Sequence, residues 1–218
     1  MKPITTRFIW LSIFAVAMAL LEAVVVAYIR GLYAKVAPPS PPVSYHTMEL
    51  WREAATLVML FAVGWLSGRR WSDRLAYAFF AFGVWDIWYY IWLKVFLDWP
   101  ASLLDWDVLF LLPLPWWGPV LSPVLIALLI CLTSLLAVIR WEQGRGLATN
   151  RWRLSLIGLG LLAVLTIFMI EAAQALWRGQ PDQVLLRPDS FPWLFFLGAF
   201  SLMAIPGLLI TWPISTSR

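Results

Sequence analysis

The sequence predicts an all-α, polytopic membrane protein: a bundle of six transmembrane helices with an outer interfacial lid rich in Pro and Trp. Apolar residues make up 62% of the 218 residues and charged residues only 13%, which is more apolar surface than a water-soluble domain can bury. The apolar residues fall into six runs of about 20, the length that crosses the hydrocarbon core. The 16 Trp residues favour the membrane–water interface.

The six runs are expected to form one integral membrane domain over residues 1–218. The first run follows two basic residues and passes an Ala-Met-Ala sequence typical of a signal-peptide cleavage site, but it continues well beyond that site, so we interpret it as a retained helix. The apolar part of segment 98–119 is too short and too Pro-broken to span, and we expect it to lie along the outer interface or to re-enter the membrane as a lid. The predicted spans are 8–29, 48–66, 75–97, 120–139, 154–177 and 193–212.

Charge alternates between the connecting segments and predicts the orientation of the spans. Lysine and arginine precede the first span, and arginine is concentrated in the second and fourth connections, whereas the other connections hold most of the acids. By the positive-inside rule, both termini lie in the cytoplasm. The basic residues lie between apolar runs, where they contact lipid head groups, so we expect no nucleic-acid partner. The expected environment is the lipid bilayer, and other membrane subunits or a second copy of the chain are open alternatives for protein partners.

Four carboxylates lie inside the predicted spans: Glu22, Glu53, Asp86 and Glu171. An ionisable group at this depth costs several kcal/mol unless it is paired, hydrated or neutralised. In the predicted topology, with a rise of about 1.5 Å per residue, all four fall in the outer half of the membrane. Acids at related depth on four helices predict a shared polar site that faces the periplasm.

Helical spacing extends three of these acids into polar stripes that run to the outer surface. Carboxylates and one histidine suit a hard or borderline divalent metal ion, although no spacing motif joins residues from separate helices. A single histidine excludes bis-His ligation, so no haem is expected. The candidate metal ligands are Glu22, Glu53, Asp86, Glu171 and His46. The supporting polar residues are Glu49, Arg52, Tyr89, Tyr90, Lys94 and Gln174, and Thr56 continues the stripe of the second span.

Two functions fit this pattern, and the sequence leaves open whether the protein is an enzyme. The leading one is an intramembrane carboxylate site that binds a divalent metal or another cation, for catalysis at the outer leaflet or for cation handling. The alternative is a non-catalytic accessory subunit of a larger complex, in which Glu22 pairs with Arg52 or Lys94 and locks two helices. A small transporter is disfavoured because the sequence shows no internal repeat.

Three stretches of the chain resemble a group of bacterial multi-pass membrane proteins of unknown activity. They are WREAATLVMLFAVGWLSG, FGVWDIWYYIWLK and DWDVLFLLPLPWWGPVLSPVL. The resemblance covers the middle half of the chain and implies a bacterial inner-membrane setting, without a cofactor, an activity or a partner.

Overall fold

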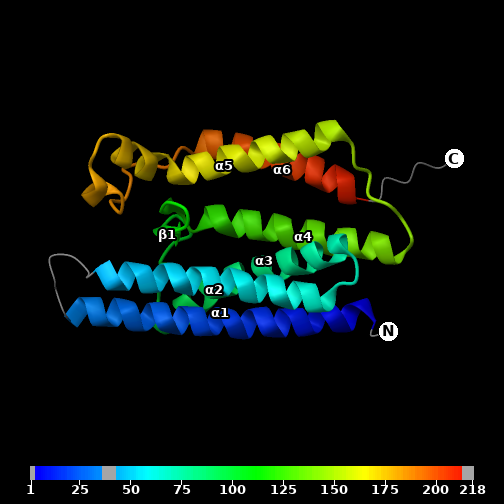
Figure 1. Ribbon diagram of the computed structural model, residues 1–218, viewed down its shortest axis with the longest axis horizontal. Helices are drawn as coiled ribbons and strands as arrows, with labels where there is room; N and C mark the ends of the chain where they lie inside the picture. The colour runs from blue at the N-terminus through cyan, green and yellow to red at the C-terminus, as the bar shows by residue number, and fades with distance from the viewer. Residues whose placement is uncertain (1–2, 36–42, 213–218) are drawn as a thin grey trace. The chain divides into compact units, whose positions relative to one another are not determined.

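The residues that the structure describes form six long apolar helices, as the sequence predicts (Figure 1). The computed structural model describes residues 3–35 and 43–212. Each helix is long and apolar enough to cross a membrane, so the fold class is the predicted all-α, polytopic one. The helices are α1 (Ile4–Lys35), α2 (Val43–Ser67), α3 (Trp71–Leu97), α4 (Leu121–Glu142), α5 (Arg151–Trp177) and α6 (Trp193–Thr211).

Several helices begin before their predicted spans, and α1 extends beyond its span by four residues at its start and six at its end. The chain packs as two compact units. Unit 1 comprises Met1–Asp105 and Pro119–Cys131, and unit 2 comprises Trp106–Gly118 and Leu132–Arg218. Helix α4 therefore contributes its first half to unit 1 and its second half to unit 2.

Helix α3 is the centre of unit 1, because α1 and α2 both pack mainly against it. The ring of Phe8 lies 5.3 Å from that of Tyr77, and the indole N–H of Trp92 donates to the carbonyl oxygen of Val16 at 3.1 Å. Early residues of α1 thus meet early residues of α3, and later ones meet later ones, so these two helices run in the same direction. Gly64 lets α2 approach α3 closely, since a Cβ at this position would lie 2.5 Å from the Cα of Ala78.

Helices α5 and α6 pack against each other in unit 2. Gly160 permits this contact, because a Cβ there would lie 2.7 Å from the carbonyl oxygen of Ala199. Phe168 on α5 contacts the ring of Phe196 on α6, with 5.9 Å between the ring centres. Aromatic packing thus reinforces the close approach of the two helices.

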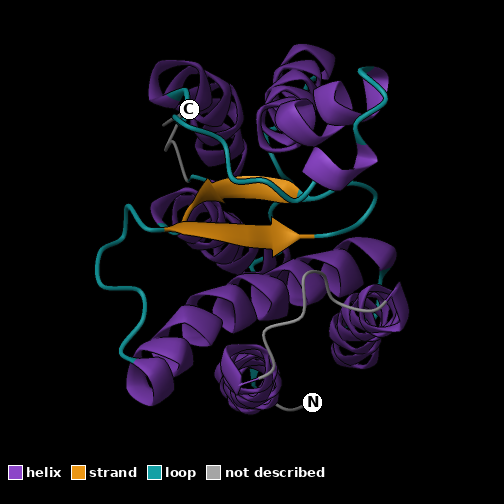
Figure 2. Ribbon diagram, turned by 90° about the vertical axis from the view of Figure 1, so that its left-hand side faces the viewer, coloured by secondary structure: helices purple, strands orange, loops and turns teal. Residues whose placement is uncertain are grey.

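The segment predicted as a non-spanning lid contains a two-stranded hairpin (Figure 2). Its strands are β1 (Trp106–Phe110) and β2 (Trp116–Pro119). The ring of Trp116 stacks on Phe168 with 6.1 Å between centres, and Trp106 meets Phe191 edge-on at 5.9 Å. These contacts with residues distant in the sequence hold the strands in unit 2, which explains why the local Pro-rich pattern did not indicate them.

Large apolar side chains remain exposed along the helices. Leu194 is 82% exposed, Val58 67% and Leu162 63%. Side chains of this kind in such number are stable only in an apolar solvent, so the lipid bilayer is the environment of the protein.

We predict that Gly160→Ala destabilises the α5–α6 contact, whereas Gly158→Ala does not. A methyl group at position 160 meets the backbone of Ala199, which cannot move aside cheaply, while nothing lies within 4 Å of a Cβ at position 158. Overpacking at the first position should lower the free energy of unfolding by about 1–3 kcal/mol. Unfolding in mixed detergent micelles, followed by circular dichroism, measures the difference. Equal stability of the two variants would contradict the close packing.

Candidate functional site

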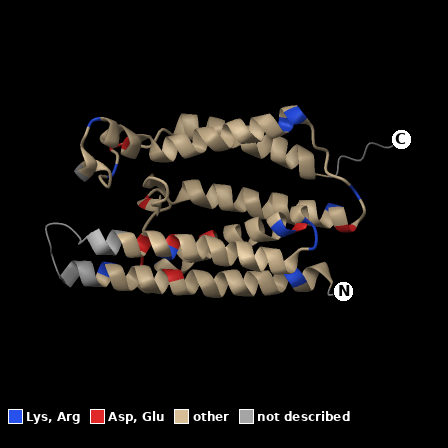
Figure 3. Cartoon of the chain, in the orientation of Figure 1, with Lys and Arg blue, Asp and Glu red and all other residues tan. Residues whose placement is uncertain are grey.

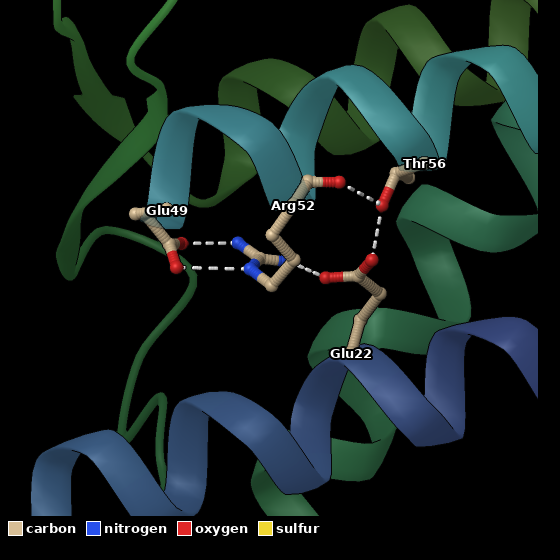
Figure 4. A network of polar contacts seen from close by, with 4 residues as sticks. All are labelled: Glu22, Glu49, Arg52 and Thr56. Carbon is tan, nitrogen blue, oxygen red and sulfur yellow. Dashed lines mark hydrogen bonds and ion pairs between the residues drawn. The ribbon is translucent and has the colours of Figure 1, made fainter. Parts of the chain in front are cut away.

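A network of four polar side chains joins α1 to α2 in unit 1 (Figure 4). The guanidinium of Arg52 forms ion pairs with Glu22 on α1 and with Glu49 on its own helix. Its Nε donates to Oε2 of Glu49 at 2.9 Å. The hydroxyl of Thr56 contacts Oε1 of Glu22 and also lies 3.0 Å from the carbonyl oxygen of Arg52. Two carboxylates therefore share one guanidinium.

Helical spacing places three of these residues on one face of α2. Glu49 and Arg52 are three residues apart, and Arg52 and Thr56 are four apart, so their side chains follow one another along the helix. Glu22 reaches this face from α1, just past the middle of that helix. Figure 3 shows the acidic residues of α1 and α2 in the half of each helix that lies away from the marked N-terminus.

Exposure decreases along the network. The side chains of Glu49 and Arg52 are each 24% exposed, whereas that of Glu22 is 7% exposed. Glu49 is thus the more accessible carboxylate, and Glu22 is the more deeply buried one. Thr56 is fully buried beside Glu22.

Two further predicted residues lie within electrostatic range of this network. Glu53, which is buried, and Tyr89 on α3 both interact electrostatically with Arg52. Glu53 also interacts with Glu49. The arrangement collects acidic groups from α1 and α2, together with a phenol from α3, around one arginine.

Asp86 is buried on α3, as predicted, and interacts electrostatically with Cys131 of α4. The two helices pack closely at Gly83, three residues before Asp86, since a Cβ at that glycine would lie 2.6 Å from the sulfur of Cys131. The shared site predicted for Asp86 with Glu22 and Glu53 stays a prediction.

Aromatic rings continue from the network along α3. The ring of Tyr89 stacks on Trp85 at 6.1 Å and meets Tyr90 edge-on at 5.2 Å. Tyr90 contacts Trp99 at 6.3 Å, and the guanidinium of Arg30 lies 4.1 Å from the centre of the Trp99 ring. This row of rings leads from Tyr89 to the C-terminal end of α3.

Lys94 lies at that end of α3 and forms an ion pair outside the network. Its Nζ is 2.7 Å from Oδ1 of Asp98, which ends the helix with a φ of 52°. The hydrogen bond from Lys94 lowers the pKa of the exposed Asp98 carboxyl. The sequence left Arg52 and Lys94 as possible partners of Glu22. In the structure, Arg52 pairs with Glu22 and Lys94 pairs with Asp98.

Two of the remaining predicted residues lie in unit 2. Glu171 is exposed and lies in unit 2, as does Gln174, whose Oε1 accepts a hydrogen bond from Arg178 at 3.1 Å. The side chain of His46 lies outside the described residues. Within residues 3–35 and 43–212, no group of three or more His, Cys, Asp or Glu side chains is arranged to hold a metal ion. The metal site stays a prediction.

Thr56 is the member of the network that sequence reasoning placed on a stripe but did not count among the site residues. A threonine inside an apolar run was the available signal, because its hydroxyl must find a partner there. Its position four residues after Arg52 points to the same face of α2.

Comparison of the chain with protein-family models, with curated proteins and with solved structures gives no match.

We predict that Arg52→Gln destabilises the protein, because it leaves the Glu22 carboxylate buried without its cation. The free energy of unfolding should fall by about 1–3 kcal/mol. The double variant Glu22→Gln/Arg52→Gln should lose less than the sum of the two single variants, as for residues in direct contact. Lys94→Gln is the control: its exposed ion pair should contribute no more than about 1 kcal/mol. An Arg52→Gln effect as small as that of the control would contradict a buried ion pair.

Proposed function

We propose that the Glu22–Arg52–Glu49 network is a cation-binding site that faces the periplasm of a bacterial inner membrane, and that the exchangeable cation is a proton. The protein then handles protons at the outer side of the membrane. The observation that carries the proposal is the sharing of one guanidinium by two carboxylates.

Charge balance supports a bound cation. Two carboxylates against one guanidinium leave one negative charge in excess, and Glu53 adds a further acid nearby. Excess charge is costly in a medium of low dielectric, so a proton or a second cation must neutralise it. Like-charged carboxylates held close together commonly share a proton for this reason.

The position of Thr56 supports a proton on Glu22. A hydroxyl group has one hydrogen to donate, yet Oγ1 of Thr56 lies near two acceptors, the Glu22 carboxylate and the Arg52 carbonyl oxygen. Both contacts are hydrogen bonds at the same time only when Glu22 carries the proton and donates it to Thr56. Glu22 then holds the proton through Oε1, while Oε2 stays beside Arg52.

The gradient of exposure supplies a route for exchange. Glu49 is accessible enough to exchange a proton with water, and Arg52 contacts both it and the buried Glu22. When the proton moves between the two carboxylates, the guanidinium remains paired with whichever one is ionised. The network therefore transfers a proton without leaving a bare charge in the membrane.

The accessory-subunit alternative is supported by a different observation. Helices α1 and α2 each pack on α3 but contact each other only sparsely. The Glu22–Arg52 ion pair is thus a principal link between them, as a helix lock in a larger complex requires. A lock needs no proton exchange, and this distinguishes the two functions.

The orientation is tested by cysteine labelling in a Cys131→Ser background. Ala101→Cys and Gln180→Cys should react with a membrane-impermeant maleimide added from the periplasmic side, because their segments hold few basic residues. Ser72→Cys and Gly146→Cys should react only after the inner membrane is opened, since they lie among clustered arginines. Reaction of Gly146→Cys from the periplasmic side would reverse the topology and place the site on the cytoplasmic side.

The proton is tested by infrared difference spectroscopy of the purified protein between neutral and alkaline buffer. The C=O stretch of a protonated carboxyl group should be present in the wild type at neutral pH and should lose the intensity of one carboxyl group in Glu49→Gln. That substitution removes one of the two carboxylates that share the guanidinium and leaves Glu22 and Arg52 as a pair of opposite charges. Asp98→Asn removes an exposed acid and should leave the band unchanged.

Elemental analysis of the same samples separates the alternatives. Wild-type protein that contains stoichiometric divalent metal, lost in both Glu22→Gln and Glu49→Gln, would identify the bound cation as a metal ion and not a proton. An unchanged carboxyl band in Glu49→Gln, with no metal in the wild type, would rule out the exchangeable cation and leave the helix lock.

A further inference from the structure

A second polar feature lies in unit 2, where the chain between α5 and α6 forms a pocket of about 410 Å³. The end of α5 forms one wall, and the loop that begins at the 3-10 helix Pro181–Gln183 forms the other. Figure 3 shows residues of both charges around this loop. The polar residues of the lining are Glu171, Arg178, Gln183, Arg187, Asp189 and Ser190.

Both walls carry both signs of charge. Glu171 and Arg178 are seven residues apart and share one face of α5, while Arg187 and Asp189 come from the loop. Arg178 is held on its helix by the hydrogen bond that it donates to Gln174. Among the described residues, no ion pair joins these acids to these arginines, although they line the same pocket. The two cations and two anions are therefore available to a ligand that itself carries both charges.

The location restricts the chemistry of that ligand. Helix α5 is a membrane-spanning helix that ends at Trp177, and α6 begins the next span at Trp193. The pocket thus opens at the level of the lipid head groups, where arginine side chains commonly bind phosphate. Exposed apolar residues lie beside it: Trp177 is 93% exposed and Leu186 61%. These side chains suit contact with acyl chains next to a bound head group.

We infer that this pocket binds a zwitterionic head group composed of a phosphodiester and a primary ammonium, as in a phosphoethanolamine lipid. Arg178 and Arg187 bind the phosphate oxygens, and Glu171 and Asp189 accept hydrogen bonds from the ammonium group. The volume is in the range of small-ligand pockets. A head group that carries only a negative charge leaves both carboxylates beside it without a cation, so the pocket selects against it.

The test uses the full-length protein in detergent with short-chain lipids as probes, and native mass spectrometry to measure the bound fraction. Dihexanoyl phosphatidylethanolamine should bind at least tenfold more tightly than dihexanoyl phosphatidylcholine, whose methylated ammonium has no hydrogen to donate. Its affinity should also exceed that of dihexanoyl phosphatidylglycerol, whose head group has no ammonium group. Equal binding of the three lipids would overturn the inference.

Variants assign the two charges of the ligand to the two pairs of residues. Arg187→Gln should weaken the binding of both phosphatidylethanolamine and phosphatidylcholine about tenfold. Asp189→Asn should remove only the preference for phosphatidylethanolamine over phosphatidylcholine. Arg145→Gln, an exposed arginine elsewhere in the same unit, is the matched control and should change neither affinity. A loss in the control as large as that in Arg187→Gln would mean that overall charge, and not this pocket, binds the lipid.

Soluble phosphoethanolamine distinguishes the source of the ligand. Competition by the soluble ester at the concentration of the short-chain lipid supports the pocket with a free phosphoethanolamine compound as its ligand. Competition only at much higher concentration supports a membrane lipid, whose acyl chains contribute to binding. No competition at any concentration, together with unchanged lipid binding in Arg187→Gln, would overturn the assignment of the head group to this pocket.

Discussion

The pairing of Arg52 with two carboxylates is the interaction on which the arrangement of α1 and α2 depends. Each of these helices packs mainly against α3 and contacts the other only sparsely, so packing between α1 and α2 by itself leaves their mutual orientation loosely determined. A buried Glu22 removes that freedom, because its carboxylate must reach the guanidinium on the neighbouring helix. In hydrocarbon the cost of an unpaired charge exceeds the cost of most changes in packing. The polar network thus determines which faces of α1 and α2 meet, and the small residues of the α2–α3 contact, such as Gly64, allow the backbones to come close once those faces are chosen.

The parts of the fold that depend on local composition could be predicted from the sequence. Six apolar runs became six helices because a span needs only length and hydrophobicity, and no tertiary contact has to be known to recognise one. The hairpin β1–β2 could not be predicted from local composition. Its strands are short and prolines lie between them. The strands are held by rings from α5 and from the loop before α6, such as Phe168 and Phe191. Contacts between residues more than fifty positions apart leave no local pattern to read.

The burial of the acids in the candidate site could be predicted, but not which helix faces bring them together. Counting residues along each span estimates how far a side chain lies from the membrane surface, and this reasoning identified Glu22, Glu53 and Asp86 as buried acids. It could not tell which helix faces meet. Glu171 was grouped with them by depth, and the structure assigns it to unit 2, where it lines a pocket. The choice of partner for Glu22 was also undetermined, because Lys94 and Arg52 were both within reach. Lys94 has an acid four residues further along its own chain, and that local pair, at the exposed end of α3, engages it.

The proton and the helix lock differ in what they require of the residues, and the composition of the network favours the proton. Replacing a buried ion pair with well-packed apolar side chains is often neutral or stabilising, so a lock by itself gives little reason to keep charges in this position. A lock also needs one acid for one base. Here a second acid, Glu49, is bound to the same guanidinium, and the hydroxyl of Thr56 lies between two acceptors with a single hydrogen to donate. Neither feature strengthens a lock, since the first adds uncompensated charge and the second places one hydroxyl hydrogen between two acceptors. One additional proton on the network neutralises the excess charge and supplies the second hydrogen bond. Glu49, the more exposed of the two carboxylates, is placed to deliver that proton.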